Sequence, residues 1–256
     1  MNPIDTLARI RIVLCQTSHP GNIGAAARAM KTMGLTRLTL VNPKHFPDPE
    51  ATARASGASD VLENARVCQS LSEALEGTVL AAALSARQRD LGPIPQPARL
   101  AAPELLPWTE AGDIALVFGG ETSGLSNAEV EQCQRLVTIP VNPDYSSLNL
   151  GAAVQVLCYE LRQAAFAGVP PLASLATPFV SPPASHEEVE GFLAHLERLM
   201  VATGFLNPNS PRRLMPKLRR LFGRVTLEKD EINILRGILA AAETPLPGSK
   251  RDGGGQ

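Results

Sequence analysis

The sequence predicts an α/β fold, with a parallel sheet and flanking helices over residues 1–168 and a small helical module after it. Short apolar runs, typical of buried strands, alternate with amphipathic segments of helical period. A strand–helix–strand order implies that neighbouring strands run parallel. The proline-rich stretch 169–185 then reads as a linker, and only helical periodicity follows it.

The first unit is a strand at 10–14, a loop at 15–21 and a helix at 22–33. Asn22 is placed to cap this helix or to contact a ligand at its start. Gly24 leaves room on the polar face of the helix, one turn before Arg28, so another group could lie there. Arg28 and Lys31 share that polar face, which is either a solvated surface or a ligand contact.

The next strands are expected at 37–41, 65–68 and 78–84, with a helix capped by Ser70 before the last of them. Residues 92–107 contain five prolines and are expected to be an irregular surface excursion.

The loop after the strand 114–118 is the most informative stretch of the chain. It holds Gly119, Gly120, Glu121 and Gly124, and a Ser-x-x-Glu pattern from Ser126 predicts a capped helix after it. Glycines at the carboxyl end of a strand let a ligand approach the main chain. The spacing resembles a phosphate-binding loop, but Leu125 replaces the required lysine, which excludes a nucleoside triphosphate site. A purely structural turn is the alternative.

A third loop follows the strand 136–140. It is a polar turn over 142–149, and it opens an apolar helix that runs from 151 to about 167. Ser146 or Ser147 is expected to cap this helix, which places Asn149 in its first turn.

Composition limits the classes of protein. The chain is 44% hydrophobic and 19% charged, which suits a globular protein with a sizeable core. Residues 1–168 carry 13 Lys and Arg against 16 Asp and Glu, a balance of −3, whereas residues 169–256 carry 11 against 9, a balance of +2. The four cysteines are scattered, so we expect buried free thiols and no metal site. Without a signal peptide or membrane span, we expect a soluble, cytoplasmic protein.

The C-terminal module is expected to contain helices at 186–203 and 229–242 within a domain spanning 186–244, before a disordered tail at 245–256. A basic run without any acidic residue separates these helices. It is either a solvated helix face or a stripe that contacts phosphates. Its members are Arg212, Arg213, Lys217, Arg219, Arg220 and Arg224.

The three loops, in this order, resemble the motifs of the SPOUT superfamily of S-adenosylmethionine-dependent RNA methyltransferases, in its 2′-O-ribose branch. The first motif is Asn22-Ile23-Gly24 with Arg28, and the second is Phe118-Gly119-Gly120-Glu121 with Gly124-Leu125. The third is Ser146-Ser147-Leu148-Asn149-Leu150. Matches in residues 143–156 and 202–237 are similar to members that methylate nucleotide 32 of the tRNA anticodon loop, on cytidine or uridine.

The resemblance implies a C-terminal trefoil knot in the sheet domain, a homodimer, a tRNA substrate and S-adenosylmethionine as methyl donor. It implies that the donor is enclosed by Leu84, Ser85, Ala86, Gly119, Gly120, Ile139, Ser146, Ser147 and Leu148. It implies catalytic roles for Arg28, Asn22, Ser147, Asn149 and Glu121, and RNA contacts by Lys31 and the basic run.

Two parts of this prediction are open. Glu121 could fix the loop or the arginine. The substrate could instead be another RNA, such as ribosomal RNA, and an inactive RNA-binding scaffold is the alternative outside the enzymes. Because a guanidinium stays charged at working pH, Arg28 is expected to grip a phosphate and stabilise the developing alkoxide, not to act as a base.

Overall fold

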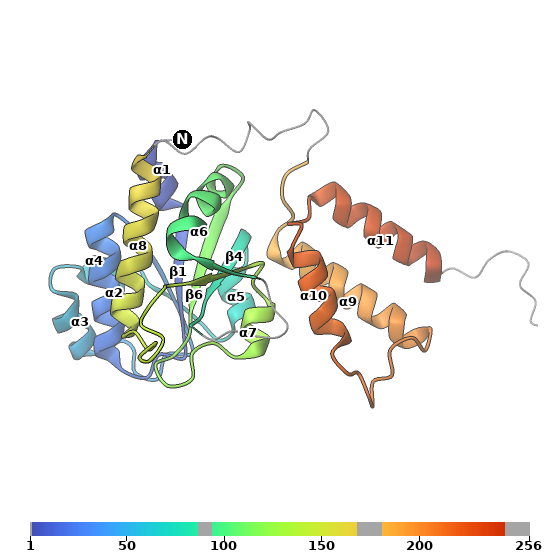
Figure 1. Ribbon diagram of the computed structural model, residues 1–256, viewed down its shortest axis with the longest axis horizontal. Coiled ribbons are helices and arrows are strands. Elements are labelled where there is room, and N and C mark those ends of the chain that lie inside the picture. Colours follow the sequence, from blue (N-terminus) through green and yellow to red (C-terminus); the bar gives the residue numbers. More distant parts are fainter. Residues whose placement is uncertain (1, 87–93, 168–180, 244–256) are drawn as a thin grey trace, which may run out of the picture.

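The computed structural model describes residues 2–86, 94–167 and 181–243. Figure 1 shows an α/β domain and, beside it, a helical module. The linker residues 169–180 and the predicted tail lie outside the described residues.

The described residues form one seven-stranded sheet with the order β3-β2-β1-β6-β4-β7-β5. Every pairing is parallel, which confirms the prediction. The strands are β1 Ile10–Cys15, β2 Arg37–Val41, β3 Arg66–Cys68, β4 Thr78–Leu84, β5 Pro95–Pro97, β6 Asp113–Phe118 and β7 Arg135–Thr138. Because all strands run in one direction, the three predicted motif loops leave the same edge of the sheet.

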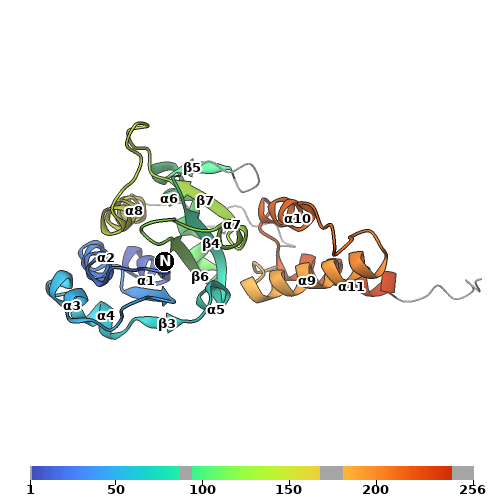
Figure 2. The ribbon, with the colours of Figure 1, turned by 90° about the horizontal axis from the view of Figure 1, so that it is seen from below.

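Helices cover both faces of the sheet (Figures 1 and 2). Alternate side chains of β1 divide between two hydrophobic cores, with Ile12 and Leu14 in one and Val13 in the other. The first core is covered by α1 Pro3–Ala8, α2 Pro20–Met33, α3 Pro49–Ala55, α4 Ser59–Glu63, α6 Ala98–Leu105, η1 Leu106–Glu110 and α8 Leu150–Phe166. The second is covered by α5 Leu71–Leu75 and α7 Asn127–Glu131.

One prediction about this domain is wrong, and another is confirmed. Residues 98–110 are not a surface excursion, because α6 buries Ala101, Ala102 and Leu105 in the first core despite Pro103 inside the helix. The prediction that another group can lie against α2 at Gly24 is confirmed. A Cβ atom there would come within 2.1 Å of the Ala51 carbonyl oxygen, so α3 occupies the gap.

The C-terminal module consists of α9 His186–Ala202, α10 Leu214–Gly223 and α11 Lys229–Glu243. The rings of Phe192 and Phe222 meet edge to face, with centroids 4.9 Å apart. Both terminal nitrogens of Arg219 donate to the Glu190 carboxylate, so α10 is tied to α9 by a paired charge as well as by packing.

His186, at the start of α9, is 4% exposed, and neither ring nitrogen has a hydrogen-bond partner among the described residues. Burial lowers the pKa of this imidazole, against the raising effect of Glu190 and Glu187, while Arg219 adds to the lowering. From the sheet domain, the uncharged Thr78, Val79 and Gln134 line the same small cavity. His186 is therefore neutral in the folded protein at pH 7.

Cys15, Cys68, Cys133 and Cys158 are buried free thiols, as predicted. Within the described ranges, no helix has the length and apolar character needed to cross a membrane. The trefoil knot stays a prediction.

Candidate active site

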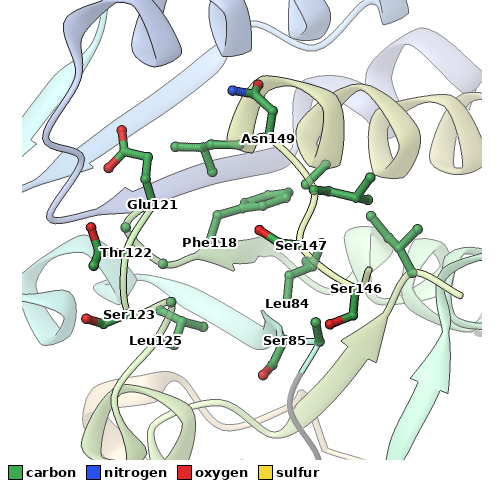
Figure 3. A pocket seen from close by; sticks show the side chains of 18 of the residues that line it. Leu84, Ser85, Phe118, Glu121, Thr122, Ser123, Leu125, Ser146, Ser147 and Asn149 are labelled. Atoms are coloured by element: carbon green, nitrogen blue, oxygen red, sulfur yellow. The ribbon is translucent and has the colours of Figure 1, made fainter. Parts of the chain in front are cut away.

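A cavity of about 610 Å³ opens where the motif loops leave the sheet (Figure 3). Such a volume suits a small organic ligand. It is lined by every residue that the sequence predicts to hold a methyl donor, namely Leu84, Ser85, Ala86, Gly119, Gly120, Ile139, Ser146, Ser147 and Leu148. Asn22, Glu121 and Asn149 line it too. The three motif loops and the carboxyl ends of β4 and β7 therefore surround one space.

The Gly-rich loop closes on itself at one wall of this cavity. The Gly124 N–H donates to the Gly120 carbonyl at 2.9 Å, and Gly124 has a φ of +64°. A Cβ atom on Gly119 would lie 2.1 Å from the Gly124 carbonyl carbon. Gly119 is thus required for the loop to fold back on itself, which differs from its predicted role of admitting a ligand.

The Glu121 carboxylate ties this loop to the first motif. One oxygen accepts hydrogen bonds from the Ser18 amide at 2.9 Å and the Ser18 hydroxyl at 2.8 Å. The other accepts from the His19 amide at 3.1 Å and the Asn22 side-chain amide at 2.8 Å. Of the two roles left open for Glu121, the contacts support fixing the loop.

These donors also set the protonation state of Glu121. Burial acts to raise the pKa of the carboxyl group, but hydrogen bonds from the Ser18 amide and Asn22 outweigh it and lower the pKa to about 2. The side chain is therefore a carboxylate at any physiological pH, and it can only accept hydrogen bonds.

Asn149 joins the third motif to the other two. Its side-chain amide donates to the Asn22 side-chain oxygen at 3.0 Å, and its own oxygen accepts from the Gly151 amide at 2.9 Å. Asn149, and neither Ser146 nor Ser147, is the N-cap of α8, so the predicted cap is wrong. Because Asn149 caps α8, Ser146 and Ser147 are not used for the cap, and both lie on the cavity wall (Figure 3).

The start of α2 differs from the prediction in a related way. The N-cap is His19, without a side-chain hydrogen bond, and the helix begins at Pro20. Asn22 is therefore already inside the first turn, where its side chain donates a hydrogen bond to Glu121 and accepts one from Asn149. His19 itself lies 3.7 Å from a carboxylate oxygen of Glu50.

Three residues that the sequence analysis named in the motifs, but not as contacts of the methyl donor, also line the cavity. Phe118, Leu125 and Leu150 are buried apolar side chains that lie beside the predicted contacts. Tyr145 also lines the cavity and is 78% exposed. Its place in the polar turn was the only available signal, since a single exposed tyrosine has no diagnostic spacing.

Arg28 and Lys31 lie away from the cavity of their own chain. Arg28 is on the exposed side of α2 and is not among the residues that line the cavity. The Lys31 ammonium is paired with the Asp60 carboxylate at 2.7 Å and donates to the Gly57 carbonyl at 3.0 Å. Lys31 therefore has a structural contact that the prediction of an RNA-binding role did not include.

The predicted basic run divides into two groups on and around α10. Arg212, Arg213, Lys217 and Arg224 are exposed. Arg219 and Arg220 are half-buried, and Arg219 is engaged by Glu190, so its charge is already paired within the module. The surface available to an anionic partner is therefore narrower than the sequence suggested.

Comparison with known proteins defines the class. The model of the SpoU rRNA methylase family matches residues 9–159, which include the sheet and all three motif loops. The chain belongs to this family.

The relatives within the family are more specific. The model of the C-terminal domain of the tRNA methyltransferase TrmJ matches residues 187–252. The tRNA (cytidine/uridine/adenosine-2′-O-)-methyltransferase TrmJ of Pseudomonas aeruginosa is 49% identical, over 93% of this chain and 95% of the relative. The cytidine/uridine TrmJ of Escherichia coli K12 is 47% identical over 96% and 100%. The crystal structure of TrmJ from Z. mobilis superposes with a TM-score of 0.79 at 33% identity, covering 91% of this chain and 99% of the other.

Proposed function

We propose that the protein transfers a methyl group from S-adenosylmethionine to the ribose 2′-hydroxyl of nucleotide 32, cytidine or uridine, in the tRNA anticodon loop, and that it does so in the cytoplasm. One observation carries the proposal: the Glu121–Asn22–Asn149 hydrogen bonds join three motif loops around a single cavity. Similarity to TrmJ enzymes over nearly the whole chain supports tRNA as the substrate.

The cavity suits the methyl donor. Leu84, Leu125 and Ile139 offer an apolar surface for an adenine ring, and Ser146 and Ser147 offer polar groups nearby. When bound, S-adenosylmethionine supplies an electrophilic methyl group on a sulfonium centre. The cavity's task is to hold that methyl group in line with the attacking ribose oxygen.

The chain's own residues orient the ribose. Asn22 is held between Glu121 and Asn149, and Asn149 between Asn22 and the Gly151 amide, so both side chains have a fixed orientation on the cavity wall. Ser147 lines the same wall. We assign these three side chains to positioning the ribose and Glu121 to holding the first loop, since its four hydrogen bonds go to that loop.

Arg28 would act in a homodimer. Because it is exposed on α2, a partner subunit could present it to a target phosphate near the cavity. Exposed apolar side chains on neighbouring helices support such an interface: Leu100 on α6, and Tyr159 and Phe166 on α8, are each about half exposed. The proposed role is phosphate binding and stabilisation of the developing alkoxide charge.

A methyl-transfer assay tests the proposal. Radiolabelled S-adenosylmethionine is supplied with total tRNA or ribosomal RNA from cells that lack the enzyme, and the labelled nucleotide is mapped. We expect label at the 2′-oxygen of position 32 in tRNA and none in ribosomal RNA. Label only in ribosomal RNA would select the other substrate, and no label with either RNA would favour the inactive scaffold. Oligonucleotides with cytidine, uridine or adenosine at the site then define specificity.

A further inference from the structure

Arg135 connects the sheet domain to the C-terminal module. It is the first residue of β7, and its guanidinium donates to the Gly223 carbonyl at 3.1 Å and to the Thr226 hydroxyl at 3.0 Å. Gly223 is the last residue of α10. A cation at a helix C-terminus is favourable, because the final carbonyl groups carry partial negative charge. Figures 1 and 2 both show α10 as the module helix beside α7 of the sheet domain.

Arg135 forms no ion pair within 4 Å among the described residues, unlike the half-buried Arg219, and the carboxylate of Glu104 acts on its charge only from a longer distance. A guanidinium taken out of water normally requires a charged partner to offset its desolvation. Here its hydrogen bonds go to neutral acceptors, and two of its three bonds cross to the module. These hydrogen bonds favour a role for Arg135 in joining the sheet domain to the C-terminal module.

The residue that Arg135 holds is itself strained. Thr226 has a φ of +39°, a conformation that is rare for a β-branched side chain. Such strain persists only where surrounding contacts enforce it. The Arg135 hydrogen bond supplies one such contact, and it fixes the turn that leads out of α10.

The same strand leads into the cavity. Val137 and Ile139 line it, and the Val137 carbonyl accepts from the Ser85 amide at 3.0 Å. The chain thus runs from the module contact at Arg135 to the cavity wall at Ile139, the residue that follows β7, about 13 Å further on at ~3.3 Å per residue. A shift of α10 against β7 would move the exposed cations Lys217 and Arg224, which lie on and just after α10, relative to that wall.

We propose that Arg135 is a positioning residue: it clamps the end of α10 to β7 so that tRNA held by the module meets the cavity in a fixed register. This inference rests on the proposed function. Loss of the clamp should leave both ligands bound but misaligned, and misplacement of about 1 Å can cost roughly 100-fold in rate.

The test compares Arg135→Met with Arg9→Met in the full-length protein. Arg9 is a matched control, because its guanidinium also donates to a main-chain carbonyl, that of Thr109 at 3.0 Å, but within the sheet domain. For Arg135→Met we expect kcat on tRNA to fall at least tenfold, with the Kd for S-adenosylmethionine within twofold and the Kd for tRNA within threefold. Arg135→Lys should recover part of kcat. Arg9→Met should have wild-type kcat.

A structural measurement separates the clamp from the proposed function. Amide hydrogen exchange at residues 224–227 should be faster in Arg135→Met and unchanged in Arg9→Met. Thr226→Val, which removes only the hydroxyl acceptor, should shift exchange and kcat in the same direction by less, and it serves if Arg135→Met does not fold. Unchanged exchange, wild-type kcat, or a parallel loss of S-adenosylmethionine binding would overturn the inference. If the wild-type protein does not methylate tRNA, the proposed function fails, while exchange still decides whether the clamp exists.

Discussion

Replacing Glu121 by glutamine should loosen the first loop while leaving the binding of S-adenosylmethionine intact. Each carboxylate oxygen accepts two hydrogen bonds, from Ser18 on one side and from His19 and Asn22 on the other. Glutamine offers one oxygen and one NH₂ group, so in either orientation two of the four donors face another donor. Two hydrogen bonds are lost whichever way the amide turns.

The size of the effect follows from that count. A net hydrogen bond contributes about 0.5–1.5 kcal/mol, and this site is exposed, so the lower part of the range applies. The substitution therefore destabilises the ordered conformation of the first loop by ~1–2 kcal/mol. Because about 1.4 kcal/mol is a factor of ten, kcat should fall about tenfold or more as Asn22 loses its anchor.

The assay pairs single-turnover methyl transfer with calorimetric binding of S-adenosylmethionine. Glu121→Gln should bind S-adenosylmethionine with an affinity within a few fold of the wild-type value, since the carboxylate points at the first loop. Glu129→Gln is the matched control, because among the described residues that carboxylate completes the α7 capping box and contacts Gln16 and the Cys15 thiol, but takes no part in the Asn22–Glu121–Asn149 contacts. It should lower stability slightly and leave kcat near wild type. Wild-type turnover by Glu121→Gln would refute the reasoning.

The pH dependence gives a second measure of the same group. Because the folded-state pKa of Glu121 is lowered to about 2 from an ordinary 4.5, its stabilising contribution is complete above pH 4.5 and is lost as the pH falls toward 2. The free energy of unfolding of Glu121→Gln should therefore depend less on pH between 4.5 and 2 than that of the wild type.

Three further predictions concern the rest of the chain. Arg28→Ala should keep S-adenosylmethionine binding while the rate of methyl transfer falls by about two orders of magnitude or more. Lys31→Ala, on the same helix, should have a far smaller effect. Near wild-type turnover of Arg28→Ala would exclude the catalytic role assigned to Arg28. If Lys217 and Arg224 both contact phosphate, the double substitution Lys217→Ala/Arg224→Ala should weaken tRNA binding and reduce the slope of log Kd against log salt by about 2. Filter binding measures both quantities. An unchanged slope would show that these two side chains do not contact tRNA. Since the pKa of buried His186 is lowered from 6.5, the free energy of unfolding should fall as the pH drops below 6.5, and denaturant titrations should show this dependence weakened in His186→Leu.

Local patterns were enough to predict most of the sheet. The bounds of β2 and β4 match the apolar runs 37–41 and 78–84, because buried parallel strands are continuously apolar. The capping box at Ser126 is also a local pattern, and it is confirmed. α6 was missed because proline density argues against a helix, whereas burial against α8 outweighs the local cost of Pro103.

The site was harder to predict for a different reason. Ser146, Ser147 and Asn149 are all good N-cap residues within four positions, and propensity does not choose among them. Asn149 caps α8 while its amide reaches Asn22, a contact that depends on α2 and α8 packing together. The resemblance to a known family supplied the residues, but only the fold shows that Glu121 serves the first loop and that Arg28 lies outside the cavity.

The Asn149–Asn22 hydrogen bond spans 127 positions of the sequence, and the Asn22–Glu121 bond spans 99. Contacts of such sequence separation carry a large loop-closure cost and form late in folding. During synthesis, the first motif leaves the ribosome long before α8 exists to complete the cavity. A nascent or truncated chain ending before Asn149 cannot make the Asn149–Asn22 bond. We therefore expect the methyl donor to bind the complete domain, whose cavity includes residues 145–150, and by binding to stabilise that state.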